Sequence, residues 1–137
     1  MSVTRAVAPP RPHPAELLEE ISRSVVRLHK EHVGLGPPKA RTYIGEDVVV
    51  CVLEGGFSTA ERTLLGHGKA GAVIQQRAAL EDALREPLIE TIERLVARKV
   101  VGFTSGVQPD GEISTEVFLL EPERPGRGAA SRLLRDA

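Results

Sequence analysis

Aromatic side chains and cysteines are scarce in this sequence. Phe, Trp and Tyr together make up 3% of the 137 residues, and tryptophan does not occur. Proteins that bind single-stranded nucleic acid stack bases on aromatic rings, so this composition disfavours that class. The single cysteine, Cys51, excludes an internal disulfide and suits a reducing compartment. Because Cys51 lies in a Val/Leu-rich run, we expect it to be a buried free thiol.

An excess of one charge and long apolar runs are also lacking. The net charge is -1, so no global field attracts nucleic acid or an anionic membrane. No apolar stretch approaches the roughly 18 residues that a membrane span needs. Residues 1–13 are proline-rich and lack the apolar segment of a secretory signal, and residues 122–137 are rich in arginine. We therefore expect a soluble cytoplasmic protein with a flexible arm at 1–13, one domain at 14–121 and a disordered tail at 122–137.

Hydrophobic periodicity predicts a helix and a hairpin in the first half of the domain. Residues 14–33 carry acidic side chains in the first turns and basic ones in the last, which matches the helix dipole. Residues 39–44 alternate as a strand, and the β-branched run 48–53 follows a tight turn. The predicted apolar face of the helix is Leu17, Leu18, Ile21, Val25 and Leu28, with His32 one turn further on.

The second half shows a similar order of elements. Ser58 and Glu61 have capping-box spacing, which opens a short helix ending near residue 65. A long helix is predicted over about 70–97, with a kink or a split caused by Pro87. Residues 99–107 and 112–120 are predicted strands joined by a turn. The predicted apolar stripe of the long helix is Val73, Leu80, Leu84, Leu88, Ile92 and Leu95.

These elements indicate one sheet covered on one side. One amphipathic helix cannot bury the face of a hairpin alone, whereas two hairpins joined edge to edge and covered by helices can. We predict an α+β fold in which two helix–strand–strand halves form a four-stranded, mainly antiparallel sheet with helices packed on one face. The core should be aliphatic, because aromatic residues are so few.

Three stretches together resemble a known family. They are residues 34–43, which open with Gly-Leu-Gly-Pro, the end of the Val-rich strand at 53–56, and the helix opening at 58–65. With 21–32 and 117–120, they resemble the MpsC-like family, named for an accessory component of a bacterial sodium-translocating, membrane-potential-generating system. The family pattern has a proline near position 59, where this chain has Thr59. The resemblance implies a non-catalytic accessory or regulatory protein of a membrane ion-transport system.

Two segments are candidates for binding a partner or an anion. Between positions 23 and 41, at the end of the first helix and just after it, the basic residues Arg23, Arg27, Lys30, Lys39 and Arg41 face only one acidic residue, Glu31, although cations at a helix C-terminus also have a structural explanation. In the short helix, the capping box explains Glu61, whereas Arg62 is free to bind an acidic group or to pair with Glu54. The candidate set is Gly34, Gly36, Pro37, Lys39, Arg41, Tyr43, Glu61 and Arg62.

Complete catalytic, metal and nucleotide motifs are not found in the sequence. His29 and His32 can share a helix face, but a metal needs further ligands. The segment around His67 and Lys69 lacks the spacing and the Ser or Thr of a phosphate-binding loop. We therefore assign no catalytic residue, cofactor or metal.

Two further functional classes remain open beside the accessory protein. One is a small-molecule sensor or small enzyme with a pocket near Arg41, Tyr43, Glu61 and Arg62, assisted by His67. The other is nucleic-acid binding through the basic residues, which the charge and composition disfavour. Open sheet edges favour a homodimer, and the resemblance implies transporter subunits as partners, so that any membrane association is peripheral and passes through a partner.

Overall fold

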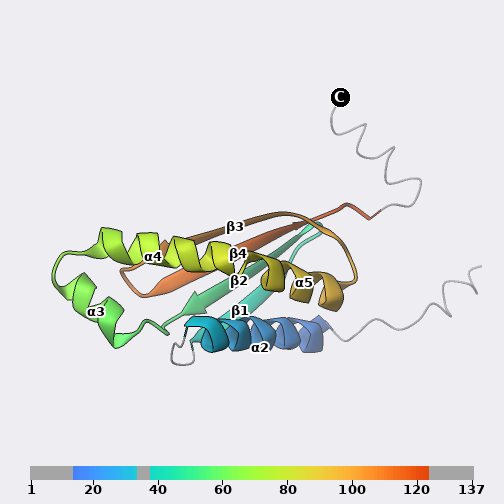
Figure 1. Ribbon diagram of the computed structural model, residues 1–137. Helices are drawn as coiled ribbons and strands as arrows, with labels where there is room; N and C mark the ends of the chain where they lie inside the picture. Colours follow the sequence, from blue (N-terminus) through green and yellow to red (C-terminus); the bar gives the residue numbers. More distant parts are fainter. Residues whose placement is uncertain (1–13, 34–37, 124–137) are drawn as a thin grey trace, which may run out of the picture.

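The computed structural model describes residues 14–33 and 38–123. Its elements in chain order are α2 (Pro14–Val33), β1 (Lys39–Ile44), β2 (Val48–Glu54), α3 (Thr59–Gly66), α4 (Ala70–Ala83), α5 (Arg85–Val96), β3 (Val100–Gln108) and β4 (Ile113–Leu120), as labelled in Figure 1. The predicted arm at 1–13 and the tail from residue 124 onward lie outside the described residues.

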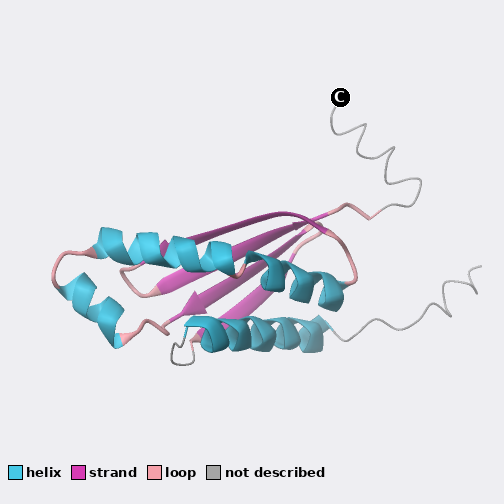
Figure 2. Ribbon diagram, viewed as in Figure 1, coloured by secondary structure: helices cyan, strands magenta, loops and turns pink. Residues whose placement is uncertain are grey.

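The strands form one sheet in the order β1-β2-β4-β3. The hairpins β1–β2 and β3–β4 join through β2 and β4, and all three pairings are antiparallel. The helices lie on one side of this sheet (Figure 2). The predicted α+β fold is therefore confirmed, including the covered face and the four strands.

A mainly aliphatic core lies between the sheet and the helices. Helix α2 packs on β1 and α5, α4 and α5 pack on β3, and α3 contacts α4. Phe118 of β4 is the largest fully buried side chain, and Cys51 of β2 is buried as expected. The buried residues of the core cluster are Ile21, Val25, Val49, Cys51, Leu53, Leu84, Leu88, Ile92, Val100, Phe118 and Leu120.

The long helix predicted at 70–97 is split, and the break comes earlier than the proline. Helix α4 ends at Ala83, Leu84 links the helices, and α5 begins at Arg85. Pro87 occupies the first turn of α5, where a missing N–H leaves no hydrogen bond unmade. The backbone of Leu88 still donates to the carbonyl of Leu84 (3.0 Å), so the two helices meet without an intervening loop.

Two predicted helix faces need correction. In α2 the buried face continues to His29, whereas His32 is exposed and bonds to the carbonyl of Leu28 (3.0 Å). In α4 the buried positions after Val73 are Arg77 and Glu81 rather than Leu80, which is partly exposed. These charged residues turn inward because each has a buried partner of opposite charge.

The other side of the sheet has no helix over it within the described residues, and we call it the open face. Most of its central side chains are apolar: the outward positions of β1, β2 and β4 include Tyr43, Val48, Val50, Val52, Val117 and Leu119, with Thr115 as a polar neighbour of Val52. Tyr43 and Leu119 are 51% and 50% exposed. Antiparallel sheets usually direct polar residues to an uncovered face, so this apolar surface is unusual.

Candidate functional site

A histidine and two glutamates meet in the interior between α2, α4 and β4. The Nε2 atom of His29 lies 2.7 Å from Oε2 of Glu81 and 2.8 Å from Oε2 of Glu116. The Nδ1 atom of His29 lies 2.9 Å from the carbonyl oxygen of Val25. A carbonyl oxygen only accepts, so Nδ1 carries a hydrogen and donates it. Nε2 therefore faces both carboxylates.

Burial and mutual contact shift the pKa values of this cluster. Burial alone would lower the pKa of His29, but the adjacent carboxylates of Glu116 and Glu81 outweigh it and raise the pKa to about 10. Burial raises the pKa of Glu116 to about 8, against the opposing effect of His29. Burial would also raise the pKa of Glu81, but the hydrogen bond from His29 lowers it overall. The positive charge of His29 and the negative charge of Glu81 therefore stabilise each other in the interior.

A second buried ion pair lies next to this cluster on α4. Arg77 donates from Nε to Oε2 of Glu61 (2.7 Å) and from Nη2 to Oε1 (2.9 Å), and both side chains are almost fully buried. The guanidinium also lies 4.1 Å above the ring of Phe57. Glu61 completes the predicted capping box by accepting from the backbone of Ser58 (2.9 Å). This arrangement fixes α3 and the segment before it onto α4.

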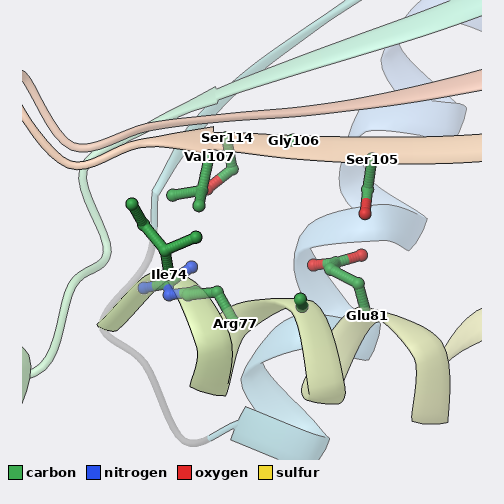
Figure 3. A pocket seen from close by; sticks show the side chains of 8 residues that line it. Ile74, Arg77, Glu81, Ser105, Gly106, Val107 and Ser114 are labelled. Carbon is green, nitrogen blue, oxygen red and sulfur yellow. The ribbon is translucent and has the colours of Figure 1, made fainter. Parts of the chain in front are cut away.

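A cavity of about 140 Å³ lies between α4 and the strands β3 and β4, beside both charged groups. Arg77 and Glu81 line its helix side, and Ser105, Val107 and Ser114 line its strand side (Figure 3). Figure 3 shows the Glu81 carboxylate rising from α4 toward the hydroxyl of Ser105. Of the three residues in the cluster, Glu81 lines the cavity, so the cavity reaches the cluster at the Glu81 carboxylate.

The predicted residues of the short helix have structural partners. Glu61 is buried in the pair with Arg77, a role beyond the capping box that explained it in the sequence. Arg62 pairs with Glu112, at 2.8 and 3.1 Å, rather than with Glu54. The Glu61 pair joins α3 to α4, and the Arg62 pair joins α3 to the turn before β4. Neither Glu61 nor Arg62 lines the cavity.

The predicted residues of the first strand lie at the edge of the sheet. Lys39, Arg41 and Tyr43 occupy outward positions of β1, next to the open face. Arg41 lies 3.4 Å from Glu54, and both are well exposed. Of the other members of the candidate set, Gly34, Gly36 and Pro37 lie outside the described residues. The structure thus places Lys39, Arg41 and Tyr43 together, and Glu61 and Arg62 on a different element.

Basic side chains of α2 gather over a shallow hollow. Arg23, Arg27 and Lys30 line it together with Ala40 of β1. Arg23 also pairs with Glu20 on its own helix (2.7 Å). Three of the basic residues near the end of the first helix therefore share one surface, and anion binding there stays a prediction.

Sequence reasoning missed His29, Arg77, Glu81 and Glu116, although their positions carried a signal. His29 follows Val25 by one helical turn, and Glu116 precedes Phe118 by two strand residues, so both continue a buried row. Polar residues were assigned to the surface because such residues are rarely buried without a partner. The partners come from distant segments, which no local pattern identifies.

The described helices include none with the length and apolar character required to traverse a bilayer. A comparison with curated proteins found no significant match, and neither did a comparison with solved structures. A family model described as "Na+-translocating membrane potential-generating system (MpsC)" matches residues 14–122. This match spans all the elements of the sheet and of the helix layer, and the chain belongs to the MpsC family.

Proposed function

We propose that this protein is a non-catalytic accessory subunit of a Na+-translocating, membrane-potential-generating system, and that it acts by docking its open face onto a protein subunit of that system. The family supplies the biological context. The observation that carries the docking is the open face itself, an apolar sheet surface opposite the helices. A cytoplasmic location, with peripheral attachment to the membrane through the partner, belongs to the same proposal.

The open face has the composition of a binding surface. Tyr43, Val50 and Val117 lie side by side across three strands, and Val48 lies beside Leu119. Contiguous exposed apolar patches on a folded domain mark interaction sites, whereas scattered apolar residues do not. A tyrosine at the edge adds a large, rigid contact with a polar tip, which suits an interface.

Charged residues border this apolar centre on one side. Lys39 and Arg41 of β1 lie beside Glu54 of β2, so the border carries both signs. A charged rim around an apolar centre is the usual arrangement of a protein–protein interface. It suits a folded protein partner better than a lipid surface, because an anionic membrane would select basic residues alone.

A small-molecule pocket around Arg41, Tyr43, Glu61 and Arg62 has less support. Arg41 pairs with Glu54, Glu61 with Arg77, and Arg62 with Glu112, so these side chains have separate partners. The cavity beneath α4 is lined by other side chains.

The test uses affinity purification from detergent-solubilised membranes of the organism that encodes the chain. We compare the full-length protein with Leu119→Lys, on the open face, and with Ile74→Lys, an exposed apolar residue of α4 (41%) on the helix side. The proposal predicts that the unchanged protein and Ile74→Lys retain a membrane-spanning subunit of an ion-translocating system, identified by mass spectrometry. Leu119→Lys should lose it while remaining folded.

Two results would overturn this function. One is retention of the same subunit by Leu119→Lys at the level of the unchanged protein. The other is a combination of two findings. Light scattering shows that the unchanged protein is a dimer and that Leu119→Lys is a monomer, and the unchanged protein retains no membrane subunit. That second result would assign the face to a second copy, which fulfils the homodimer prediction and excludes the docking.

A further inference from the structure

We propose that His29, Glu81 and Glu116 bind a divalent transition-metal ion of the zinc, manganese or iron(II) class. One ring nitrogen and two carboxylate oxygens face a common point from α2, α4 and β4, and these atoms all lie within 4.8 Å of one another. All three residues are buried. The site lies on the helix side of the sheet, so it is independent of docking at the open face.

The orientation of His29 suits a metal ligand. Its Nδ1–H donates to the carbonyl oxygen of Val25 (2.9 Å), which leaves Nε2 directed at the two carboxylates. Histidine ligands commonly hold their second nitrogen in this way, because the hydrogen bond fixes the ring and makes the free nitrogen more basic.

Glu116 has unmet bonding capacity in the interior. The residue is 0% exposed, and neither of its carboxylate oxygens accepts a hydrogen bond from the described residues. The Nε2 atom of His29 lies 2.8 Å from Oε2 of Glu116, but a hydrogen on Nε2 points to Glu81 instead. Oε1 of Glu81 is likewise buried without a hydrogen-bond partner. Buried polar atoms nearly always have a hydrogen-bond partner or another ligand, so these three oxygens are available to coordinate a metal ion.

Charge and spacing both fit a divalent ion. In the metal-bound form the imidazole is neutral and both carboxylates are ionised, so the three ligands carry a charge of -2 and release the protons they hold without metal. A divalent cation cancels this charge, so the bound site holds no unbalanced charge in the interior. Metal–ligand bonds of about 2.0–2.2 Å place neighbouring ligand atoms roughly 3 to 3.5 Å apart. The present distances from Nε2 to the carboxylate oxygens are 2.7 and 2.8 Å, so a small outward rotation of the side chains admits the ion.

The cavity supplies access and a further coordination position. Glu81 borders it, and its side chain is 11% exposed, whereas those of His29 and Glu116 are at most 3% exposed. Three protein ligands leave a position for water or another small ligand on the cavity side. The imidazole favours a transition metal over Mg²⁺ or Ca²⁺, which prefer oxygen ligands alone.

The experiment is titration of the chelator-treated, full-length chain with ZnCl₂, MnCl₂ and MgCl₂ in separate calorimetric runs. We expect saturable binding of one equivalent of Zn²⁺ or Mn²⁺ and a higher Tm in its presence, with no such effect of Mg²⁺. With Co²⁺, a visible absorption band should appear at the same stoichiometry. The absence of saturable binding of both Zn²⁺ and Mn²⁺ at millimolar concentration would overturn the proposal.

Variants tie the binding to these side chains. Glu116→Gln and His29→Gln should each weaken binding by more than about 100-fold, beyond the usual effect of changing an outer partner. His32→Gln and Cys51→Ala are the matched controls, because they remove another histidine of α2 and the only thiol, and they should bind as the unchanged chain does.

The metal site can be tested even if some ligand variants do not fold. If Glu116→Gln and His29→Gln do not fold, as judged by circular dichroism, Glu81→Gln at the cavity decides the matter. Unchanged affinity in a folded ligand variant, or loss of binding in His32→Gln or Cys51→Ala, contradicts the assignment. Loss of the Zn²⁺-dependent rise in Tm in a folded ligand variant supports it.

Discussion

Replacement of Arg77 by methionine tests the buried ion pair that connects α3 to α4. The change keeps much of the apolar stem but removes the guanidinium that bonds twice to Glu61. The Glu61 side chain is 4% exposed, so its carboxylate would stay buried without its counter-charge. Its remaining bond to the backbone of Ser58 offsets only part of that loss.

The expected cost follows from the burial of both partners. Removing one member of a buried pair typically costs about 3–5 kcal/mol, because a charge is left uncompensated. The contact of the guanidinium with Phe57, at 4.1 Å, adds about 1 kcal/mol. We therefore expect Arg77→Met to lose about 4–6 kcal/mol, which is a large share of the stability of a small domain.

Urea denaturation followed by circular dichroism measures this loss. Arg41→Gln is the control, because Arg41 and Glu54 form an exposed pair whose contribution should be under about 1 kcal/mol. The double variant Arg77→Met with Glu61→Gln should be more stable than Arg77→Met alone, since it removes the orphaned charge. A loss in Arg77→Met no larger than that in Arg41→Gln would show that the buried pair does not stabilise the fold.

The same pair gives a pH dependence. Burial would raise the pKa of Glu61, but Arg77 and Ser58 lower it below its ordinary value of 4.5. The contribution of the ionised pair is thus complete above about pH 4.5 and is lost as the pH falls through the lower, folded-state value. The difference in unfolding free energy between the unchanged protein and Arg77→Met should therefore narrow in acid, in a titration from neutral pH downward. An equal difference at every pH would contradict this origin of the stability.

Three further predictions test the helix cap, the thiol and the two sheet faces. Ser58→Ala should cost about 1 kcal/mol in urea denaturation, because it removes the cap of α3; no loss would exclude that role. Burial raises the pKa of Cys51 to about 12, so at pH 8 the folded protein should react with a thiol reagent on the order of 1,000-fold more slowly than the unfolded chain, and equal rates would contradict its burial. Phe118→Ala should cost about 3–5 kcal/mol and the neighbouring Leu119→Ala under about 1 kcal/mol, since one side chain is 0% and the other 50% exposed; similar losses would refute a sheet covered on one side.

Local patterns determined the elements and the layer arrangement. The β-branched run at β2 is typical of a central strand, and β2 does lie in the middle of the sheet; β4, predicted only as a strand, is the other central strand. The capping box of Ser58 and Glu61 is formed, because it depends only on residues close in the chain. Such features are readable since a side chain's period and its immediate neighbours decide them.

The buried charges could not be derived in the same way. Arg77 finds Glu61 16 positions away, and His29 finds Glu81 52 positions away. A buried charge is stable only where an oppositely charged or hydrogen-bonding side chain of another element contacts it, and that contact depends on the tertiary packing. The spacing of His29 from Val25 and of Glu116 from Phe118 is consistent with buried rows, but the predicted helix face ran to His32 instead, and no local pattern indicates that His29 and Glu116 face each other.

Photo-crosslinking in intact cells tests most directly whether the open face holds a membrane subunit. A photoreactive residue at position 119 lies on that face, and one at position 74 lies on the helix side with similar exposure. We expect an adduct with a membrane-spanning subunit of an ion-translocating system from position 119 and none from position 74. An adduct with that subunit from position 74 alone, or no adduct with it from either position, would exclude docking through the open face.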